Sequence, residues 1–186
     1  WNRYASNRPL YIGEDVLRTV KAADPQNPNS HQLPAKHKLH EQSSNVQGTV
    51  LWYAAAVVNN PGNYAKLLQS NYWRYPALQP LMPFIDNKAP KKPRALKVSW
   101  SDDGCLLHWK APKGKGWENE AYKYVVYKFG PDEEIDLDNP MKIIAITYQT
   151  ALRLNYNGGD TKYTYVVTAL DRMSNESVGK KKKIKL

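Results

Sequence analysis

The sequence predicts two parts that are built differently: a partial α/β region over residues 1–87 and an all-β sandwich over residues 88–186. A proline-rich segment separates them, because residues 83–93 (PFIDNKAPKKP) cannot sustain a helix or a central strand. Before this segment, apolar runs with β-branched residues alternate with runs of helical spacing. After it, short alternating segments follow one another with turn residues between them, which is typical of an all-β domain.

The first part is predicted to have the order β-α-β-α. Residues 10–13 (LYIG) predict a short strand before a polar, proline-bearing loop, and residues 33–42 have helical spacing. The apolar run 46–58, with its late alanine triplet, predicts a buried strand that opens into a loop. Asn60 and Pro61 then offer a helix cap and a first-turn proline. The residues at helical spacing after them are Tyr64, Leu67, Leu68 and Tyr72.

Buried strands that alternate with helices indicate a parallel sheet, and two such units are too few to close any common parallel fold. The strand that begins at Val46 is expected to be apolar on both faces, with one neighbouring strand at residues 10–13. An uncovered face and an unpaired edge favour association with another chain. We therefore expect this part to self-associate or to fold back onto the sandwich. The contacts expected for that association are Trp73, Tyr75 and Phe84.

The second part is predicted to contain about seven short strands, and its length matches the ~100 residues of an immunoglobulin-like sandwich. Leu96, Val98 and Trp100 share one face of its first strand, and Leu107 and Trp109 share one face of its second. Strands are expected at 95–101, 105–110, 122–127, 142–147, 163–170 and 178–186, with turns at 102–104 and 157–160. The last strand is rich in lysine, as is typical of an edge strand.

Composition excludes several classes of protein. With 41% hydrophobic and 24% charged residues, the chain is not disordered throughout. No apolar run approaches the ~18 residues of a membrane-spanning helix, so no transmembrane segment is expected. A single cysteine, Cys105, excludes an internal disulfide framework and a cysteine-based zinc cage. Since Cys105 lies in an alternating strand, we expect a buried and inert thiol.

The net charge of +10 raises the question of a nucleic-acid partner. Residues 1–87 carry 8 Lys/Arg against 5 Asp/Glu, whereas residues 88–186 carry 19 against 12. Five of those lysines lie within residues 180–186, so the basicity is largely that of a tail. No stacking aromatics interleave with these lysines, and we therefore expect a solvated edge strand and no nucleic-acid partner. The alternative is a tail that binds an anionic partner or an anionic membrane surface.

Residues 163–177 (YTYVVTALDRMSNES) resemble the sixth strand and the following turn of a fibronectin type III domain. Ala89-Pro90 before the first strand, Trp109 in the second strand and residues 124–128 (YVVYK) in the third fit the same family. The resemblance covers all of the second part. It implies that Trp109 is the core tryptophan and that Tyr163 is the tyrosine-corner residue, whose hydroxyl bonds to nearby backbone.

Three segments of the first part, 10–14 (LYIGE), 45–53 (NVQGTVLWY) and 71–83 (NYWRYPALQPLMP), resemble the carboxyl end of a bacterial glycosyl-hydrolase-like family related to family-10 glycoside hydrolases. That family consists of (β/α)8 barrels, often exported or lipid-anchored and often followed by a fibronectin type III module. The resemblance implies that these residues are the last two βα units and the exit into the linker. A whole barrel takes ~250 residues, so the first part is expected to be the end of a TIM-type barrel whose upstream strands are missing.

Candidate site residues follow from this resemblance, because barrel chemistry lies in the loops after the carboxyl ends of strands. Glycoside hydrolysis uses two carboxyl groups, and aromatic faces hold the sugar. Glu14 is the candidate catalytic residue, and Asp15, Trp52 and Tyr53 are candidates for substrate binding. Since Glu14 and Asp15 are adjacent, at most one of them can face a pocket. The alternative is that Glu14 is a solvated loop carboxylate and that Trp52 fills space under the barrel rim.

His31, His37 and His40 raise the question of a metal site. No acidic or cysteine ligand accompanies them at a recognisable spacing, so we expect surface or helix-face histidines, no metal and no cofactor.

The function expected from the sequence is that of the carboxyl-terminal fragment of an exported bacterial glycoside hydrolase that acts on carbohydrate. The fragment itself is expected to be inactive, because most of the strand ends that would carry carboxylates are missing. The resemblance implies a periplasmic, outer-membrane lipoprotein or secreted location. The alternative is a non-catalytic interaction or spacer module that binds protein or carbohydrate.

Overall fold

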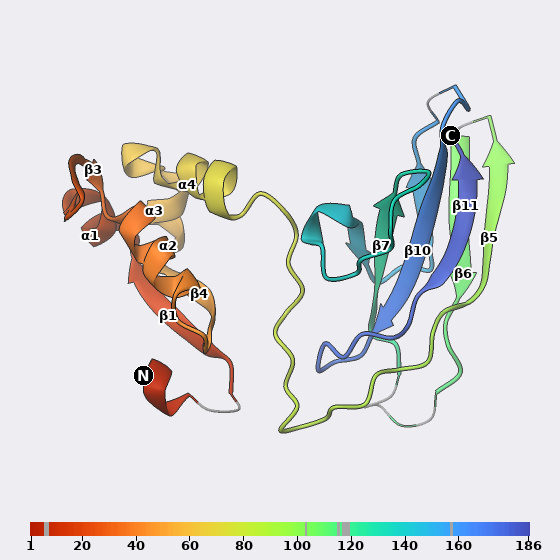
Figure 1. The fold of residues 1–186 in the computed structure, drawn as a ribbon, viewed down its shortest axis with the longest axis horizontal. Helices are drawn as coiled ribbons and strands as arrows, with labels where there is room; N and C mark the ends of the chain where they lie inside the picture. Colours follow the sequence, from red (N-terminus) through yellow and green to blue (C-terminus); the bar gives the residue numbers. More distant parts are fainter. Residues whose placement is uncertain (6–7, 103, 115, 117–119, 157) are drawn as a thin grey trace. The chain divides into compact units, whose positions relative to one another are not determined.

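The computed structural model describes residues 1–5, 8–102, 104–114, 116, 120–156 and 158–186. It divides into two compact units, Trp1–Arg74 and Tyr75–Leu186 (Figure 1). Residues 75–87, which the sequence assigned to the first part, are grouped with the second unit. The side chain of Leu78 packs against a buried cluster of that unit, and Asn175 Nδ2 donates to the Asp86 carbonyl at 3.2 Å.

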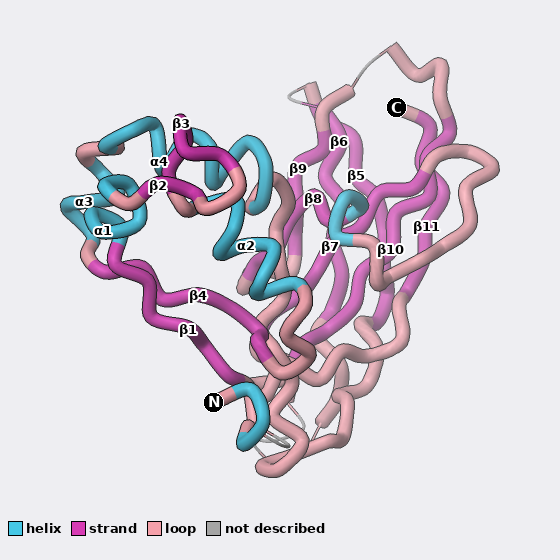
Figure 2. Tube along the Cα trace, turned by 60° about the vertical axis from the view of Figure 1, so that its left-hand side comes forward, coloured by secondary structure: helices cyan, strands magenta, loops and turns pink. Residues whose placement is uncertain are grey.

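The first unit is built around a pair of parallel strands, β1 (Leu10–Asp15) and β4 (Val46–Trp52), which run side by side in Figure 2. Parallel pairing confirms the prediction from the alternation of strands and helices. The remaining elements are η1 (Asn2–Tyr4), α1 (Val16–Lys21), β2 (Ala23–Asp24), β3 (Asn27–His31), α2 (Leu33–Glu41), α3 (Ala54–Val58), η2 (Pro61–Asn63), α4 (Tyr64–Leu67) and the π-helical turn η3 (Leu68–Tyr72).

Two expectations about these elements are wrong. The segment after β1 is not a loop, since it contains α1 and the small antiparallel pair β2–β3. The alanine triplet does not extend β4 or open into a loop, because Ala54–Val58 forms α3. Alanine has the highest helix propensity, and this preference prevails once the strand ends at Trp52. Asn60 and Pro61 do begin η2, but the Asn60 side chain makes no cap bond there, and its Oδ1 instead accepts a hydrogen bond from the Ala65 amide of α4 at 2.8 Å.

The helices of the first unit cover one face of the β1–β4 pair. Leu51 packs against a buried cluster, and the residues that form this cluster are Val16, Leu33, Ala56, Tyr64 and Leu68. The other face carries Tyr11, Val50 and Trp52, all of them exposed. Neighbouring side chains of a strand alternate between the faces, so each strand has one buried and one open side. A parallel pair that is covered on one face only is unusual, because parallel sheets are normally buried on both faces.

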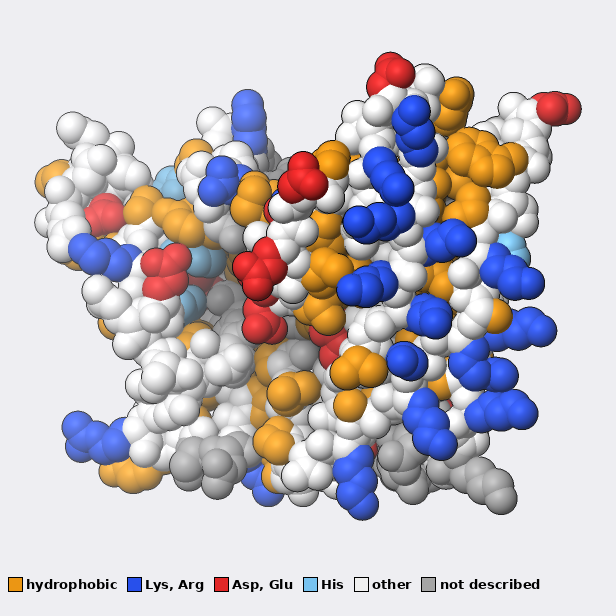
Figure 3. All heavy atoms as spheres, turned by 45° about the vertical axis from the view of Figure 1, so that its right-hand side comes forward, with side chains coloured by type: hydrophobic (Ala, Val, Ile, Leu, Met, Phe, Trp, Pro, Cys, Tyr) orange, Lys and Arg blue, Asp and Glu red, His pale blue; other side chains and the backbone are white. Residues whose placement is uncertain are grey.

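The second unit is an antiparallel sandwich of two sheets. One sheet has the order β5-β6-β9 and the other has the order β11-β10-β7-β8. The strands are β5 (Arg94–Ser101), β6 (Gly104–Lys110), β7 (Lys123–Phe129), β8 (Ile143–Thr147), β9 (Ala151–Leu154), β10 (Lys162–Leu170) and β11 (Lys180–Lys185), with η5 (Pro140–Lys142) before β8. Six of them match predicted strands, and β9 had no predicted counterpart. The lysine-rich strand β11 lies at a sheet edge, as predicted, and Lys and Arg side chains gather on the face of the sandwich that is turned forward in Figure 3.

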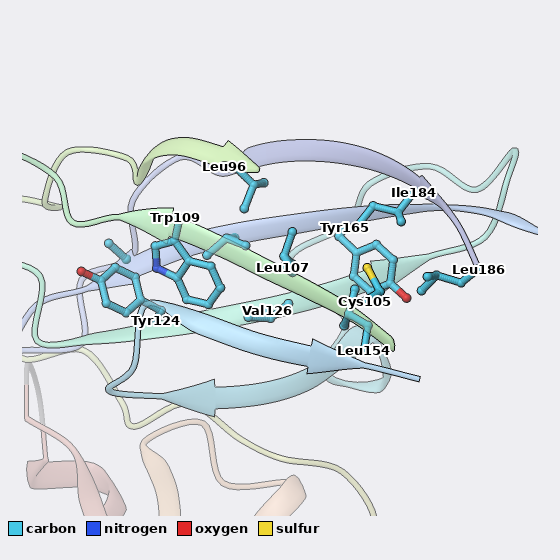
Figure 4. Packing of buried hydrophobic residues seen from close by; sticks show 12 residues of the cluster. Leu96, Cys105, Leu107, Trp109, Tyr124, Val126, Leu154, Tyr165, Ile184 and Leu186 are labelled. Carbon is cyan, nitrogen blue, oxygen red and sulfur yellow. The ribbon is translucent and has the colours of Figure 1, made fainter. Parts of the chain in front are cut away.

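The core between the two sheets contains Trp109, which is 3% exposed, as predicted for the core tryptophan (Figure 4). Its ring meets the Tyr124 ring edge to face at 5.4 Å between centroids. The other buried members are Leu96, Cys105, Leu107, Val126, Leu154, Tyr165, Val167, Ala169, Ile184 and Leu186. Trp100 shares the inward side of β5 with Leu96, but it is 56% exposed and lies outside this core.

Both faces of strand β7 are buried, although one face of an antiparallel sheet can be exposed to water. Tyr124 and Val126 belong to the core between the sheets, whereas Val125, Tyr127 and Phe129 belong to a second buried cluster. Leu78 and Leu137 pack against this second cluster, so irregular segments before and after β7 cover the outer face of its sheet. The linker-like residues 75–87 are thereby part of the packing of the second unit.

Candidate functional site

The parallel pairing brings the four predicted site residues to one edge of the first unit. Glu14 and Asp15 end β1, and Trp52 ends β4 and is followed by Tyr53. In the register of the pair, Asp15 lies opposite Trp52. The sequence prediction placed these residues at strand ends, and the structure places the two strand ends together.

Glu14 points to the helix-covered face and is 3% exposed, so it is not a solvated loop carboxylate. The Tyr64 hydroxyl donates to its Oε1 at 2.8 Å, and the Thr19 hydroxyl lies 3.1 Å from the same oxygen. The Lys36 ammonium donates in turn to the Thr19 hydroxyl. A carboxylate in the first strand is therefore tied to α1 and α4, and through Thr19 to α2.

The electrostatics of this group favour a neutral tyrosine beside a carboxylate. Burial, the hydrogen bond to Glu14 and the charge of Glu14 together raise the pKa of Tyr64 far above its ordinary value. Tyr64 therefore remains a hydrogen-bond donor at all physiological pH values. Within the described part of the chain, Glu14 Oε2 is buried and has no hydrogen-bond partner. Glu14 thus has one oxygen fixed by donors and one oxygen that is free to accept.

Asp15 and Trp52 lie on the open face. The Asp15 side chain accepts from the Arg18 amide at 3.0 Å and so caps α1. Trp52 is 68% exposed, and the Tyr53 ring meets it edge to face at 6.4 Å, across a cis peptide bond. Glu14 and Trp52 therefore face opposite sides of the sheet, and they do not line one pocket. At its strand ends, the open face therefore presents two aromatic rings and the Asp15 carboxylate, which caps α1.

The three histidines of the first unit have separate environments. His37 stacks on Tyr72 at 4.1 Å between ring centroids, and the Thr49 hydroxyl lies 3.4 Å from His40 Nδ1. The pKa of His37 is lowered, and burial is the largest cause. The charges of Glu14 and Glu41 act in the opposite direction, whereas His40 contributes to the lowering. Among the described residues, no three His, Cys, Asp or Glu side chains gather into a group that could hold a metal ion.

The predicted structural residues of the sandwich are only partly tested. Trp109 is buried, as described above, and Cys105 is a buried free thiol whose pKa is raised by that burial. The Tyr163 ring packs at the margin of the core, with the Lys128 ammonium 3.7 Å from its centre. The predicted bond of the Tyr163 hydroxyl to the preceding turn stays a prediction. That turn and the turn at 102–104 include Asn157 and Asp103, which lie outside the described residues.

Sequence reasoning missed a surface pocket of about 990 Å³ at one end of the sandwich. Two exposed aromatic residues, Trp100 and Tyr156, line it together with charged and amide side chains. A signal was present in the sequence, since Asp102 and Asn155 lie near two aromatics in turn-rich segments. Strand alternation placed Trp100 on the same face as Leu96 and Val98, but it did not predict that Trp100 is exposed.

Comparison with known proteins identifies a relative. Over 188 aligned residues the chain is 31% identical to "Glycosyl hydrolase YngK" of Bacillus subtilis (strain 168), and the match covers all of this chain and 36% of that protein. The chain thus spans about a third of the length of the curated relative. No family model matches the chain.

Among solved structures, similar chains include the structure named FN3tt mut, at 21% identity, 51% of this chain, 93% of that chain and a TM-score of 0.39. A Fn3-like protein from Clostridium thermocellum is similar at 24% identity, with 52% and 92% coverage and a TM-score of 0.37. The Spr0440 glycoside hydrolase domain, Endo-D from Streptococcus pneumoniae R6, is similar at 15% identity, with 54% and 16% coverage and a TM-score of 0.36.

No helix in the described part of the chain is long and apolar enough to cross a membrane. The order of strands in the second unit, three against four around a buried tryptophan, is that of a fibronectin type III-like sandwich. Together with the relative found over the whole chain, this order shows a protein related to a glycosyl hydrolase that carries a fibronectin type III-like domain.

Proposed function

We propose that this chain is the carboxyl-terminal part of a bacterial glycoside hydrolase, with its first unit as the last two βα units of a (β/α)8 barrel related to family 10. The observation that carries the proposal is the sequence relationship to a glycosyl hydrolase, because it extends over both units. The fibronectin type III-like sandwich then follows the barrel as a separate module.

The uncovered face of the β1–β4 pair supports the barrel assignment. In a (β/α)8 barrel, each strand turns one face to the helices and the other to the packed interior. Here the helix face carries Leu51 and Glu14, and the opposite face carries Tyr11, Val50 and Trp52. Upstream strands would cover that face, and self-association is the alternative cover.

The chemistry that this chain contributes is limited by its carboxylates. Hydrolysis needs two carboxyl groups on opposite sides of the scissile bond, about 5–5.5 Å apart for retention or about 6.5–9.5 Å apart for inversion. Glu14 and Asp15 face opposite sides of β1, and Asp15 caps α1. In our proposal the chain alone is therefore not catalytic. Trp52 and Tyr53 contact the sugar, and Glu14 orients the strand end against α1 and α4.

The test compares this chain with a longer protein from the same reading frame that includes an entire barrel. Both are assayed on chromogenic glycosides and on polysaccharides. Turnover is expected only from the longer protein, and Trp52→Ala is expected to lower it by at least tenfold. Leu39→Ala, which truncates an exposed side chain of α2, is the control and is expected to leave turnover unchanged.

Two results would refute parts of this proposal. If the longer protein turns over none of the substrates, the protein is a non-catalytic interaction module. Turnover by this chain alone that is lost in Glu14→Gln would make Glu14 a catalytic residue. The periplasmic, lipoprotein or secreted location implied by the resemblance remains a proposal, which fractionation of cells that express the longer protein would test.

A further inference from the structure

We infer that the pocket at the end of the sandwich, here called the end pocket, binds a saccharide chain. The end pocket lies where β5 turns into β6 and where β9 ends, and β11 of the opposite sheet also contributes to it. Its volume of about 990 Å³ is at the upper end of the range for ligand pockets, roughly 300–1,000 Å³. The side chains that carry the inference are Trp100, Asp102, Arg153, Asn155, Tyr156 and Lys185.

The aromatic walls of the end pocket give the first argument. Trp100 is 56% exposed and Tyr156 is 55% exposed, and their rings stand at 89° with 5.7 Å between centroids. Two large rings are thus held next to each other while much of their surface faces water. The C–H face of a sugar ring packs against such an aromatic face, and a second ring at a right angle contacts the next edge of the sugar.

The polar lining gives the second argument. Asp102 supplies acceptors, Arg153 and Lys185 supply donors, and Asn155 supplies both. A sugar hydroxyl donates and accepts at once, so it pairs with a mixed lining of this kind. A peptide strand would instead satisfy its amides along a free sheet edge, in regular main-chain pairs. The end pocket presents aromatic faces and side-chain groups at the end of the strands, which favours a saccharide.

The backbone under the end pocket is adapted to hold Tyr156. Gly159 has a φ of +78°, and a Cβ added to it would lie 2.9 Å from the Tyr156 hydroxyl oxygen. The positive φ favours glycine at this position, and the absence of a Cβ leaves room for the Tyr156 hydroxyl. The floor is rigid as well, because Leu154 pairs with Cys105 and both are buried in the core.

A comparison within the sandwich sharpens the inference. A second aromatic pair, Tyr122 and Tyr148, has nearly the same geometry, with 5.3 Å between centroids and an angle of 80°. There, however, the Lys123 ammonium lies 5.5 Å from each ring, and the adjacent cavity has only about 90 Å³. The two pairs are thus similar in aromatic geometry and differ in the volume of the space beside them.

The inference rests on the proposed function for its ligand class, since a hydrolase of polysaccharides gains from a second contact with its substrate. Holding the polymer on the sandwich raises its effective concentration at a catalytic site in the same chain. The site itself stands on the described residues alone, and its occupancy does not require that the chain hydrolyse anything.

The experiment titrates the isotope-labelled full chain with cellohexaose, xylohexaose, chitohexaose and hexagalacturonic acid, up to about 5 mM, and follows amide shifts by NMR. At least one of these probes is expected to shift the resonances of the end pocket. Trp100→Ala and Tyr156→Ala are each expected to weaken binding by about tenfold or more. Tyr148→Ala is the matched control and is expected to leave the affinity unchanged. A thermal unfolding curve verifies that each variant is folded, and Asp102→Ala provides a second test of the site.

The possible outcomes separate the site from the proposed function. Saccharide binding that depends on Trp100 supports the end pocket, even if the longer protein hydrolyses nothing. Binding that is unchanged in Trp100→Ala but lost in Trp52→Ala overturns the end pocket and retains the proposed site on the first unit. An absence of binding by all four probes overturns the inference, and so does a shift of the same resonances by a short tryptophan-containing peptide in place of the sugars.

Discussion

The two units differ in how completely their sheets are covered. In the sandwich, β7 is buried on both faces, by the opposite sheet on one side and by segments that carry Leu78 and Leu137 on the other. In the first unit, the β1–β4 pair has helices on one face and exposed Tyr11, Val50 and Trp52 on the other. The sandwich therefore contains the segments that cover both faces of β7, whereas the first unit exposes a face that a parallel sheet normally buries.

The two units also differ in how completely a carboxylate is hydrogen-bonded. The first unit contains the buried carboxylate Glu14 with one oxygen that lacks a partner among the described residues. In the sandwich, the carboxylate of Glu176 accepts from both the Tyr127 hydroxyl, at 2.7 Å, and the Thr168 hydroxyl. A buried polar atom without a partner is costly, and among the described residues the sandwich has such an atom as well, Trp109 Nε1 in its core.

The largest expected effect is on the complete core. Trp109→Ala should destabilise the sandwich by about 3–5 kcal/mol, because it removes the largest side chain between the two sheets. Such a loss is comparable to the whole stability of a marginal domain. Urea unfolding that is followed by the amide signals of β6 and β10 measures it. Tyr148→Ala, an exposed aromatic on the same unit, serves as the control and should change the unfolding free energy by less than about 0.5 kcal/mol.

A loss below about 1 kcal/mol in Trp109→Ala would mean that the two sheets hold together without this residue. The difference between the two units could then not be attributed to the covered core of the sandwich.

The next effect concerns the buried carboxylate of the first unit. Tyr64→Phe keeps the ring in the helix-side cluster but removes the donor to Glu14 Oε1. Leaving a buried acceptor with fewer donors should cost about 1–3 kcal/mol, seen as faster hydrogen exchange in β1 and α4. Tyr4→Phe, on an exposed tyrosine, should have no effect on exchange. Unchanged exchange in Tyr64→Phe would show that Glu14 does not depend on this bond.

The sequence predicted many of the helices and strands in the two units, but not all of them. The parallel pairing of β1 with β4, the helix α2 and six of seven sandwich strands follow from periodicity and turn residues. The helix α3 does not, because an apolar run such as 46–58 has no period that separates a strand from a helix. Glu14 was found as a site residue, but its direction depends on Thr19 and Tyr64, which come from helices that the sequence did not place against β1.

The end pocket shows the same limit in the sandwich. Alternation placed Trp100 on the same face of its strand as Leu96 and Val98. Its exposure depends on how far the opposite sheet extends, which is a property of the assembled sandwich and not of one strand. Tyr156 lies just before the predicted turn at 157–160, but turn residues do not predict that its hydroxyl approaches Gly159.

A smaller effect is expected from His37. Burial lowers its pKa below the ordinary 6.5, so the unfolded chain binds a proton more readily than the folded one. The unfolding free energy of the first unit should therefore fall as the pH drops through about 6.5, and the fall should level off below the folded pKa. His37→Asn should flatten this dependence between pH 7.5 and pH 5. The same slope in the variant would assign the dependence to other groups.

The smallest expected effect on stability comes from the open face. Trp52→Ser removes a side chain that is 68% exposed, and it should change the unfolding free energy by less than about 0.5 kcal/mol. Leu51→Ala, one position away but packed against the helix-side cluster, should cost clearly more, because it removes buried apolar contacts. If the open face drives self-association, Trp52→Ser should also shift sedimentation toward the monomer. A large loss of stability in Trp52→Ser would show that this face is already covered within the chain, and the first unit would then be as complete as the sandwich.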